Sequence, residues 1–499
     1  MSTHRSVFRG GVKLGFSQAF VQGCSFIRNV IVARIISPED FGIAAIFAMT
    51  FFLLEMISNL AADVLLVQAP DGDEPEFQKS AQALHAFRGM VNAAIIFALA
   101  GPIADLFGVP QVRWAFHCLA LLPLCKALNH LDNNRLQREM NFGPQIVSDI
   151  GSNLLVTLLA LPLGLWLRDY SLMLWLLVGQ VASFMILSHL MAKRRYAWAW
   201  HAGYIRRIVA FGWPLLINGL LMYVIFQGDR FIIGASKRLF AHSTYTLTDL
   251  GIYSVAFGLT MAPTMLVANV STQLFLPLLS RAQEMKEQFE RRYAGCSELM
   301  SLVAAAIAIP FILAGGWVVT LVYGAKYAAA AGFIGWLGAM WALRILRVAP
   351  TLAAMARGDT RNSMVSNMAR TTALAGILFV AATGRPLVWV SICGFVGELL
   401  ALTVCLWRLQ REHDVSVRIA LRPFMAAGVS MTLAGIAVMA GVPQLGWAVS
   451  CAVAFVLTLL SVVAMLIVFP EVRTGLQMVL QRDKATSPAA GVVTAANQG

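Results

Sequence analysis

Residues 26–49 read FIRNVIVARIISPEDFGIAAIFAM. Two apolar runs flank the short polar stretch SPED at 37–40, and Arg28 lies within the first run. A helix needs about 20 mostly apolar residues to cross a lipid bilayer. The two runs are therefore typical of the end of one membrane span and the start of the next, and the stretch predicts two spans joined by a tight turn.

Apolar windows of this length recur along the whole chain, and short polar connections join them. There are about fourteen, near 12–34, 42–66, 81–105, 111–131, 144–166, 172–191, 207–235, 250–276, 295–321, 328–355, 362–382, 387–407, 423–441 and 446–469. They predict an all-α polytopic membrane protein with about fourteen transmembrane helices.

The composition agrees with a membrane protein. Of the 499 residues, 59% are hydrophobic and 13% are charged, whereas a soluble domain has about 45–50% apolar and roughly 25% charged residues. The net charge is +13 on an apolar chain, which does not favour a nucleic-acid-binding surface. The seven cysteines form no CxxC pair, so neither a disulfide framework nor a zinc site is indicated.

The distribution of cations predicts the orientation. Of the 38 Lys and Arg residues, about 25 fall in the two tails and in the connections on the same side of the membrane as the tails, and about seven fall in the connections on the other side. By the positive-inside rule this asymmetry predicts that both termini are cytoplasmic. The first apolar stretch contains Gln18 and Gln22 and has no small-residue cleavage site, so we expect a retained span rather than a signal peptide. The acidic connection DGDEPE at 71–76 is the exception to the charge rule.

Six arginines remain inside the predicted spans. Each would cost roughly 2.5–3.5 kcal/mol at the centre of a lipid-facing helix, so we expect them to face protein partners or water. They are Arg28, Arg88, Arg230, Arg344, Arg347 and Arg370.

Position within the spans separates these arginines. Arg28 and Arg230 lie toward the outer ends of their spans, where a side chain that extends to the interface is an alternative explanation. Arg344 and Arg347 are three residues apart, on one face of a helix near the middle of a long apolar run. Two cations on one buried face favour an anion nearby.

Other polar groups accompany the arginines. Gln22, Asn29 and Asn92 lie on polar stripes that either line a shared cavity or join helices by hydrogen bonds, as in any membrane bundle. A similar stripe on the span at 144–166 holds Asp149 and Asn153. Three acidic residues also lie within spans, where each has either a cationic partner or a raised pKa suited to proton coupling: Glu55, Asp229 and Glu398.

The chain contains a weak internal repeat. The segment FQGDRFIIGASKRLF at 226–240, followed by LGIYSVAFGL at 250–259, matches the order of features in 26–49: a polar pair, an apolar run, a short loop and a glycine that opens the next span. Asp229 and Arg230 correspond to Arg28 and Asn29. Six spans separate the two copies, which predicts two lobes related by an axis along the membrane normal.

At these residues the chain resembles the polysaccharide transporter (oligosaccharide flippase) family of the multidrug/oligosaccharidyl-lipid/polysaccharide exporter superfamily. Together with the topology, the matching pieces cover about residues 10–470, and their specificity comes from their order. They are ARIISPEDFG (33–42), GDRFIIG (228–234), LGIYSVA (250–256), LPLLSR (276–281) and VYGAKYAAAAG (322–332). None of them is a catalytic signature.

The resemblance implies two pseudo-symmetric six-helix lobes around a central cavity, at 1–206 and 207–411, with two further helices at 412–470 and a cytoplasmic tail at 471–499. It implies a bacterial inner-membrane transporter, without cofactor or metal, that moves a polyprenyl-pyrophosphate-linked oligosaccharide across the membrane for exopolysaccharide or O-antigen synthesis by alternating access. A polysaccharide polymerase or export complex is the candidate protein partner. Cavity arginines in such flippases hold the pyrophosphate, and Arg28 and Arg230 match by position.

Two other functions compete with this one. A multidrug or small-cation antiporter of the same superfamily should have an acidic cavity, whereas arginines outnumber acids within these spans. A membrane glycosyltransferase, polymerase or ligase needs a larger external segment, since the longest outer connection has only about 15 residues. The DGD at 71–73 mimics a metal-binding motif but lies in a short loop, and no GxxxxGK(S/T) motif indicates ATP binding.

Overall fold

The computed structural model describes residues 2–474, with side chains from residue 15 onward except at 214 and 218. Within residues 2–474 the chain forms eighteen α-helices and three short 3-10 helices, and no strand. This confirms the all-helical fold expected from the apolar windows. The tail expected at 471–499 lies outside the described residues from 475 onward.

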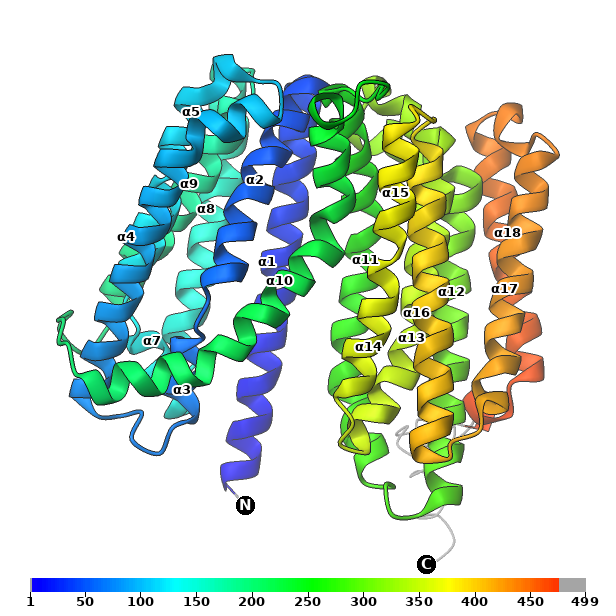
Figure 1. The fold of residues 1–499 in the computed structure, drawn as a ribbon. Coiled ribbons are helices and arrows are strands. Elements are labelled where there is room, and N and C mark those ends of the chain that lie inside the picture. Colours follow the sequence, from blue (N-terminus) through cyan, green and yellow to red (C-terminus); the bar gives the residue numbers. More distant parts are fainter. Residues whose placement is uncertain (1, 475–499) are drawn as a thin grey trace, which may run out of the picture. The chain divides into compact units, whose positions relative to one another are not determined.

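The first of two compact units contains the described residues up to Ala256 together with Thr320–Ala329 and Leu374–Val390. Most of its long helices run side by side, and short helices lie near their ends (Figure 1). They are α1 (Ser2–Ile35), α2 (Pro38–Ser58), α3 (Ala62–Gln68), α4 (Pro75–Leu106), η1 (Pro110–Val112), α5 (Arg113–Leu119), α6 (Leu121–Ala127), α7 (Asp132–Arg138), α8 (Gly143–Leu167), α9 (Ser171–Met191), α10 (Ala202–Leu239) and the start of α11 (Leu247–Ser280).

The second unit contains Phe257–Val319, Ala330–Ala373 and the described residues from Ser391 onward. Besides most of α11, its helices are α12 (Lys286–Tyr323), α13 (Ile334–Ala356), α14 (Arg361–Thr371), most of α16 (Val388–His413), α17 (Val417–Met439), η3 (Val442–Leu445) and α18 (Trp447–Val468). The short helices η2 (Ala325–Gly332) and α15 (Ala373–Ala382) fall at the boundaries between the units.

Twelve helices in the described chain are long and apolar enough to cross a membrane. They correspond to twelve of the expected windows; α14 and α15 together form one of them. The window at 12–34 lies in α1, where glutamines and an arginine lower the hydropathy, and the window at 111–131 is divided among η1, α5 and α6. The count of fourteen is therefore not confirmed, although a multi-span membrane protein is.

The window at 42–66 does not form one helix. α2 ends at Ser58, Asn59 accepts a hydrogen bond from the backbone N–H of Ala61 through its side chain, and Ala61 adopts a left-handed conformation (φ 49°). An Asn side chain that bonds to the backbone two residues on favours a turn over a helix. The chain then re-enters a helix at α3, so the window forms two helices separated by a turn.

Two of the sequence pieces that carry the family resemblance meet at one end of the first unit. The side chain of Arg34, at the end of α1, donates to the carbonyl oxygens of Leu321 and Val322 at the end of α12, the latter at 2.7 Å. Lys326 donates in return to the carbonyl oxygens of Arg34 (2.9 Å) and Ile36. The last carbonyl groups of a helix lack intrahelical partners. Here Arg34 donates to carbonyl groups at the end of α12, and Lys326, just after α12, donates to carbonyl groups at the end of α1.

The starts of α2 and α11 cross at backbone contact distance in the same unit. A Cβ atom at Gly251 would overlap the carbonyl oxygen of Pro38, and one at Gly42 would overlap the carbonyl oxygen of Leu247. Both obstacles are backbone atoms, which cannot rotate away. Glycine is therefore required at both positions, and this explains the glycines in SPEDFG and LGIYS.

The acidic loop at 71–76 is held by cations from three other segments. Asp71 pairs with Arg207 on α10 (2.7 Å), and Asp73 pairs with Arg135 on α7 (3.1 Å) and with Arg194 (3.0 Å). The hydrogen bond from Arg207 holds the pKa of Asp71 below its usual value. The exception to the charge rule is thus an ion-paired loop.

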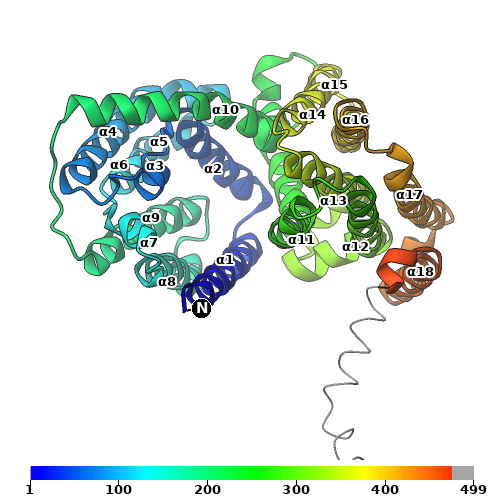
Figure 2. The ribbon, with the colours of Figure 1, turned by 90° about the horizontal axis from the view of Figure 1, so that it is seen from below.

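The first part of α10 lies across the ends of α3 and α4 beside this loop (Figure 2). Ile208 of α10 is fully buried in an apolar cluster with Leu66 of α3 and Phe77 of α4. Tyr204, one turn earlier, donates a hydrogen bond to Glu74 at 2.5 Å. Apolar packing and ion pairs together attach this part of α10 to the loop.

Asp132 is the buried centre of the same network. Its carboxylate accepts hydrogen bonds from Arg135 Nε (2.6 Å) and from the backbone N–H groups of Lys193 (2.7 Å) and Arg194 (3.2 Å). Burial alone would raise the pKa of Asp132, but these hydrogen bonds outweigh it and the pKa lies below its usual value. The ionised carboxylate therefore ties α7 to the segment after α9.

We expect Gly251→Ala to lower the free energy of unfolding by about 1–3 kcal/mol, because the added methyl group forces α2 and α11 apart. The measurement is the thermal unfolding of the purified protein in detergent. Gly258→Ala, on the same helix with no atom within 4 Å of the new Cβ, is the matched control. Equal melting temperatures for the two variants would contradict the close crossing.

We expect Asp132→Asn to destabilise the protein by about 3 kcal/mol or more at neutral pH, since it leaves the buried Arg135 without its closest counter-charge. A lowered folded-state pKa means that the contribution of Asp132 is present above its unfolded pKa and is lost as the pH falls through the folded value. The deficit of the variant should therefore shrink in acid.

The control for Asp132 is Asp414→Asn, because the Lys286–Asp414 pair is exposed and should contribute nothing measurable. Unfolding curves of the three proteins at several pH values provide the comparison. A deficit of Asp132→Asn that does not depend on pH would show that the ionised carboxylate is not its source.

Candidate functional site

Three of the six predicted arginines surround one buried carboxylate in the second unit. Glu398 on α16 has no exposed surface. Its oxygens lie 3.0 Å from Arg344 Nη1, 3.3 Å from Arg347 Nη2 and 2.7 Å from Arg370 Nε. We call these four residues the arginine–glutamate cluster. A cationic partner was one of the two alternatives for Glu398, and the structure contains this ion pair.

Helix geometry positions the members of the cluster. Arg344 and Arg347 are three residues apart on α13, so they project from the same face. Arg370 is in the last turn of α14, and Gly397, next to Glu398, lies close to the carbonyl oxygen of Arg370 and the side chain of Ala373. The small residue allows α16 to approach α14 closely enough for the ion pair.

The cluster contains three positive charges and one negative charge. Arg347 also donates to the neutral side chain of Asn367 (3.0 Å), and Arg344 lies over the ring of Trp341 (5.7 Å). Arg347 Nε and Arg370 Nη1 are buried without a hydrogen-bond partner. Within these four residues the cations outnumber the carboxylate by two, and Arg347 and Arg370 keep spare N–H donors, so the cluster has the charge and the donors to hold a dianion.

Arg28 is buried on α1 of the first unit. Its Nη2 atom donates to Ser25 one turn earlier (3.1 Å), and its Nη1 atom is buried without a hydrogen-bond partner. On the same helix Asn29 is half-buried and Gln22 is exposed. Burial of Arg28 does not support the alternative that its head group reaches the solvent.

Arg88 and Asn92 of α4 contact the end of α2. Asn92 Nδ2 donates to Ser58 Oγ at 2.7 Å, and Arg88 Nη1 approaches the carbonyl oxygen of Ser58 and the side chain of Asn59, each at 3.4 Å. These contacts satisfy polar groups that the break after α2 leaves without helical partners. They are the interhelical hydrogen bonds that the sequence offered as one alternative for Asn92.

Asp229 and Arg230 of α10 make different contacts. Asp229 accepts hydrogen bonds from the hydroxyl of Tyr253 on α11 (2.7 Å) and from the backbone N–H of Arg230 (2.8 Å). Arg230 Nη2 donates to the carbonyl oxygen of Phe226 one turn earlier (2.7 Å). Asp229 thus joins two helices of the first unit.

Glu55 forms an ion pair with Lys126 of α6, a residue that the sequence analysis did not select. Glu55 is buried, whereas the lysine side chain is 38% exposed. Lys126 was missed because it lies near the end of its apolar window, where a cation is ordinary by the positive-inside rule. A carboxylate in the window at 42–66 and a lysine in the window at 111–131 are the signal that could have suggested the pair.

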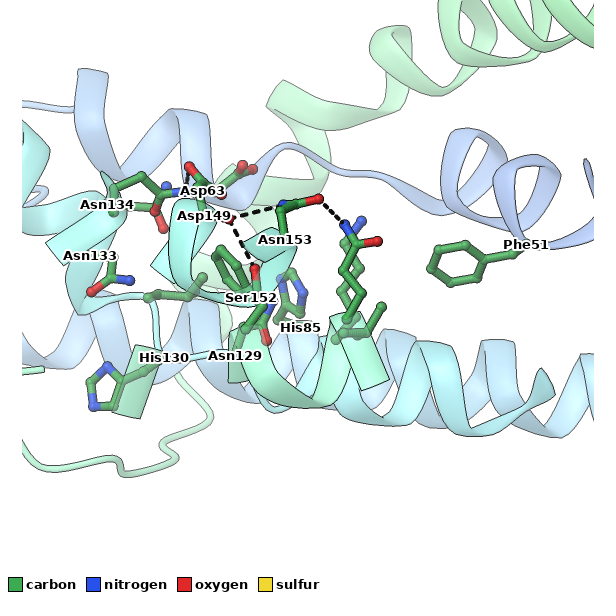
Figure 3. A pocket seen from close by; sticks show the side chains of 16 residues that line it. Phe51, Asp63, His85, Asn129, His130, Asn133, Asn134, Asp149, Ser152 and Asn153 are labelled. Carbon is green, nitrogen blue, oxygen red and sulfur yellow. Dashed lines mark hydrogen bonds between the residues drawn. The ribbon is translucent and has the colours of Figure 1, made fainter. Parts of the chain in front are cut away.

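A polar cavity of about 370 Å³ lies near Lys126 in the first unit (Figure 3). Asp63, His85, Lys126 and Asp149 contribute charged or titratable groups to it. Six carboxamide side chains also line it: Asn129, Asn133, Asn134, Gln145, Asn153 and Gln180. None of the six predicted arginines is among the lining residues, so this cavity and the arginine–glutamate cluster are chemically distinct sites.

The polar stripe on α8 leads into this cavity. Asp149 accepts a hydrogen bond from Gln145 one turn earlier (3.0 Å), and Asn153 Oδ1 accepts one from Gln180 of α9 (3.1 Å). The sequence showed Asp149 and Asn153 on one face, but not that α6, α7 and α9 would complete the wall.

A family model described as "Polysaccharide biosynthesis protein" matches residues 31–332. The succinoglycan biosynthesis transport protein ExoT of Rhizobium meliloti (strain 1021) is 26% identical over 275 residues, 53% of this chain and 52% of ExoT. The match thus spans about half the length of that relative. An uncharacterized membrane protein in the cps region of Klebsiella pneumoniae is 19% identical over 385 residues, 76% of each chain.

Among solved structures, the lipid II flippase MurJ in an inward closed conformation superimposes with a TM-score of 0.64 and 12% identity, covering 90% of this chain and 98% of MurJ. An inward-facing multidrug resistance MATE family transporter of the MOP superfamily superimposes with a TM-score of 0.61 and 12% identity, covering 79% and 95%. These similarities establish the fold. The family model matches more than half of this chain, so the chain belongs to the family described as polysaccharide biosynthesis protein.

Proposed function

We propose that this protein is a flippase that moves a polyprenyl-pyrophosphate-linked oligosaccharide across the bacterial inner membrane. It delivers repeat units for exopolysaccharide or O-antigen-type synthesis and works by alternating access. The observation that carries the proposal is the arginine–glutamate cluster, in which three guanidinium groups surround a single buried carboxylate. The family and the names of its relatives support the substrate class.

The charge of the cluster suits a pyrophosphate. Guanidinium groups bind phosphate oxygens through two parallel N–H donors, and electrostatic attraction is stronger in a buried site than in water. Glu398 compensates one of the three cations when no substrate is bound. A pyrophosphate with two or more negative charges would compensate the others and use the free donors on Arg347 and Arg370.

We further propose an orientation of the chain in the membrane and a division into two lobes. Both termini lie in the cytoplasm, and the six-span lobes at 1–206 and 207–411 move against each other while the helices at 412–470 flank them. Arg28 and Arg88 of the first lobe and Arg230 of the second are further candidates for contact with the substrate, with Gln22 and Asn29 as polar neighbours. A polysaccharide polymerase or export complex receives the product. No bond is made or broken, so these residues bind and orient the substrate.

The second candidate function is the export of an organic cation. The fold shared with a MATE transporter and the two carboxylates Asp63 and Asp149 in the cavity favour it. It is weaker because Lys126 lines the same cavity and because the buried cluster in the second unit has a net positive charge. A deletion strain that becomes drug-sensitive with a normal glycan would support this alternative.

We expect Arg347→Ala and Arg370→Ala each to reduce polysaccharide export at least tenfold, with the complete lipid-linked repeat unit accumulating on the cytoplasmic leaflet. The cause is the loss of N–H donors and positive charge for the pyrophosphate. The measurement is the amount and sidedness of lipid-linked sugar in a strain that carries only the variant. Arg385→Ala, an exposed arginine, is the control, and normal export in both cluster variants at wild-type membrane levels would refute the proposal.

We expect Glu398→Gln to lower the melting temperature, because it removes the only carboxylate of the cluster and costs about 3–5 kcal/mol. Inorganic pyrophosphate should restore part of the loss, since a ligand that binds only the folded state stabilises it. The measurement is thermal unfolding of the purified protein with and without millimolar pyrophosphate. A variant that responds to pyrophosphate no more than the wild type would argue against an anion site here.

A further inference from the structure

The polar cavity of the first unit has no role in the ion chemistry of the arginine–glutamate cluster. Its volume of about 370 Å³ is at the lower end of the roughly 300–1,000 Å³ typical of pockets for small organic molecules. A water molecule takes up about 30 Å³ in the liquid, so the space far exceeds that of a single ion with its ligands. The cavity is large enough for one or two rings of an organic molecule.

Several hydrogen-bonding groups in the lining have no partner. The side-chain carbonyl oxygens of Asn129 and Asn133 are buried and accept no hydrogen bond, although Asn133 is only 2% exposed. Among the described residues, no hydrogen bond reaches the side chains of Asp63 and Asn134. Buried polar groups are nearly always satisfied by protein, water or a ligand, so this wall is short of donors.

His130 adds one donor to the same wall. Its Nδ1 atom accepts a hydrogen bond from the backbone N–H of Asp132 (3.1 Å), and burial lowers the pKa of the imidazole. A neutral imidazole that accepts at Nδ1 carries its proton on Nε2. His130 as a whole is 3% exposed, and its Nε2 atom is buried and has no hydrogen-bond partner. The lining therefore offers the acceptor oxygens of Asn129 and Asn133 together with N–H donors on His130 and Asn134.

The charges of the cavity disfavour anions as the ligand. Asp63 and Asp149 repel a pyrophosphate or an acidic sugar, and the one lysine of the lining, Lys126, is paired with Glu55. Hydroxyl groups donate and accept at once and carry no charge, so a neutral polyhydroxylated ring matches this wall.

Figure 3 shows the arrangement of these groups. The labelled polar side chains extend from His130 and Asn133 at one end to Asn153, and Phe51 stands at the opposite end. Phe184 is a second aromatic residue of the lining. Aromatic rings offer apolar surface at low entropic cost, and the C–H face of a pyranose ring packs on such a surface while its hydroxyl groups point elsewhere.

We propose that this cavity binds a neutral sugar residue of the transported oligosaccharide and thereby contributes to selection of the glycan. The inference rests on the proposed flippase function. The cavity adjoins α7 and the 126–134 segment, next to connections that the charge rule assigns to the cytoplasm. A substrate assembled on the cytoplasmic leaflet meets the cavity from that side.

The test uses the full chain in lipid nanodiscs and three soluble probes. They are the repeat-unit oligosaccharide released from the lipid carrier of the same strain by mild acid, inorganic pyrophosphate and ethidium. Asn134→Leu is the main variant, because the Asn134 side chain makes no hydrogen bond that folding needs. Gln180→Leu is the second, and Gln410→Leu, on an exposed part of α16, is the matched control. Thermal unfolding verifies that each variant is folded.

We expect the wild type and Gln410→Leu to bind the released oligosaccharide, and both cavity variants to bind it at least fivefold more weakly. Pyrophosphate binding should stay unchanged in the cavity variants and be lost in Arg347→Ala. Failure of the wild type to bind the oligosaccharide, or equal binding by the cavity variants, overturns the sugar site but leaves the pyrophosphate result standing. Weaker ethidium binding in the cavity variants overturns it in favour of an organic cation. Failure of every protein to bind pyrophosphate counts against the flippase function itself.

Discussion

A charge placed among apolar helices must be paired, because neither lipid nor packed side chains can solvate it. Most of the informative contacts of this protein follow from that constraint. Glu398 forms ion pairs with three arginines from α13 and α14, Glu55 pairs with Lys126 of α6, and Asp132 pairs with Arg135 on α7. The first two sets of pairs join different helices, and Asp132 links α7 to the segment after α9 by accepting hydrogen bonds from the backbone N–H groups of Lys193 and Arg194, so buried charges also specify which segments pack together.

The same constraint applies to the backbone. Helix ends inside or near a membrane leave carbonyl and N–H groups without partners. Here Arg34 and Lys326 satisfy carbonyl groups at two helix ends, and Ser58 and Asn59 receive contacts from α4 where α2 stops. These contacts place the segments ARIISPEDFG and VYGAKY in one junction, although nearly 300 residues separate them.

The two polar sites differ in their charge and in the hydrogen-bonding groups that they offer to a ligand. The arginine–glutamate cluster has an excess of positive charge and free N–H donors, which matches an anionic pyrophosphate. The cavity of the first unit has two carboxylates and carboxamide groups that both donate and accept, which matches hydroxyl groups. A lipid-linked oligosaccharide carries both kinds of group, so one substrate class accounts for two sites that no single small ion would explain.

The sequence by itself determined that the chain is helical, crosses a membrane many times and carries arginines inside its spans, because length, hydropathy and charge are local properties that survive without a structure. It also placed Arg344 and Arg347 on one helix face, through their spacing of three. Only the tertiary structure decided that Arg370 and Glu398 join them, that Lys126 pairs with Glu55, and that the window at 42–66 breaks at Asn59. Helical periodicity indicates which face of a helix is polar, but not which other helix that face meets, because partner choice depends on packing between segments distant in sequence.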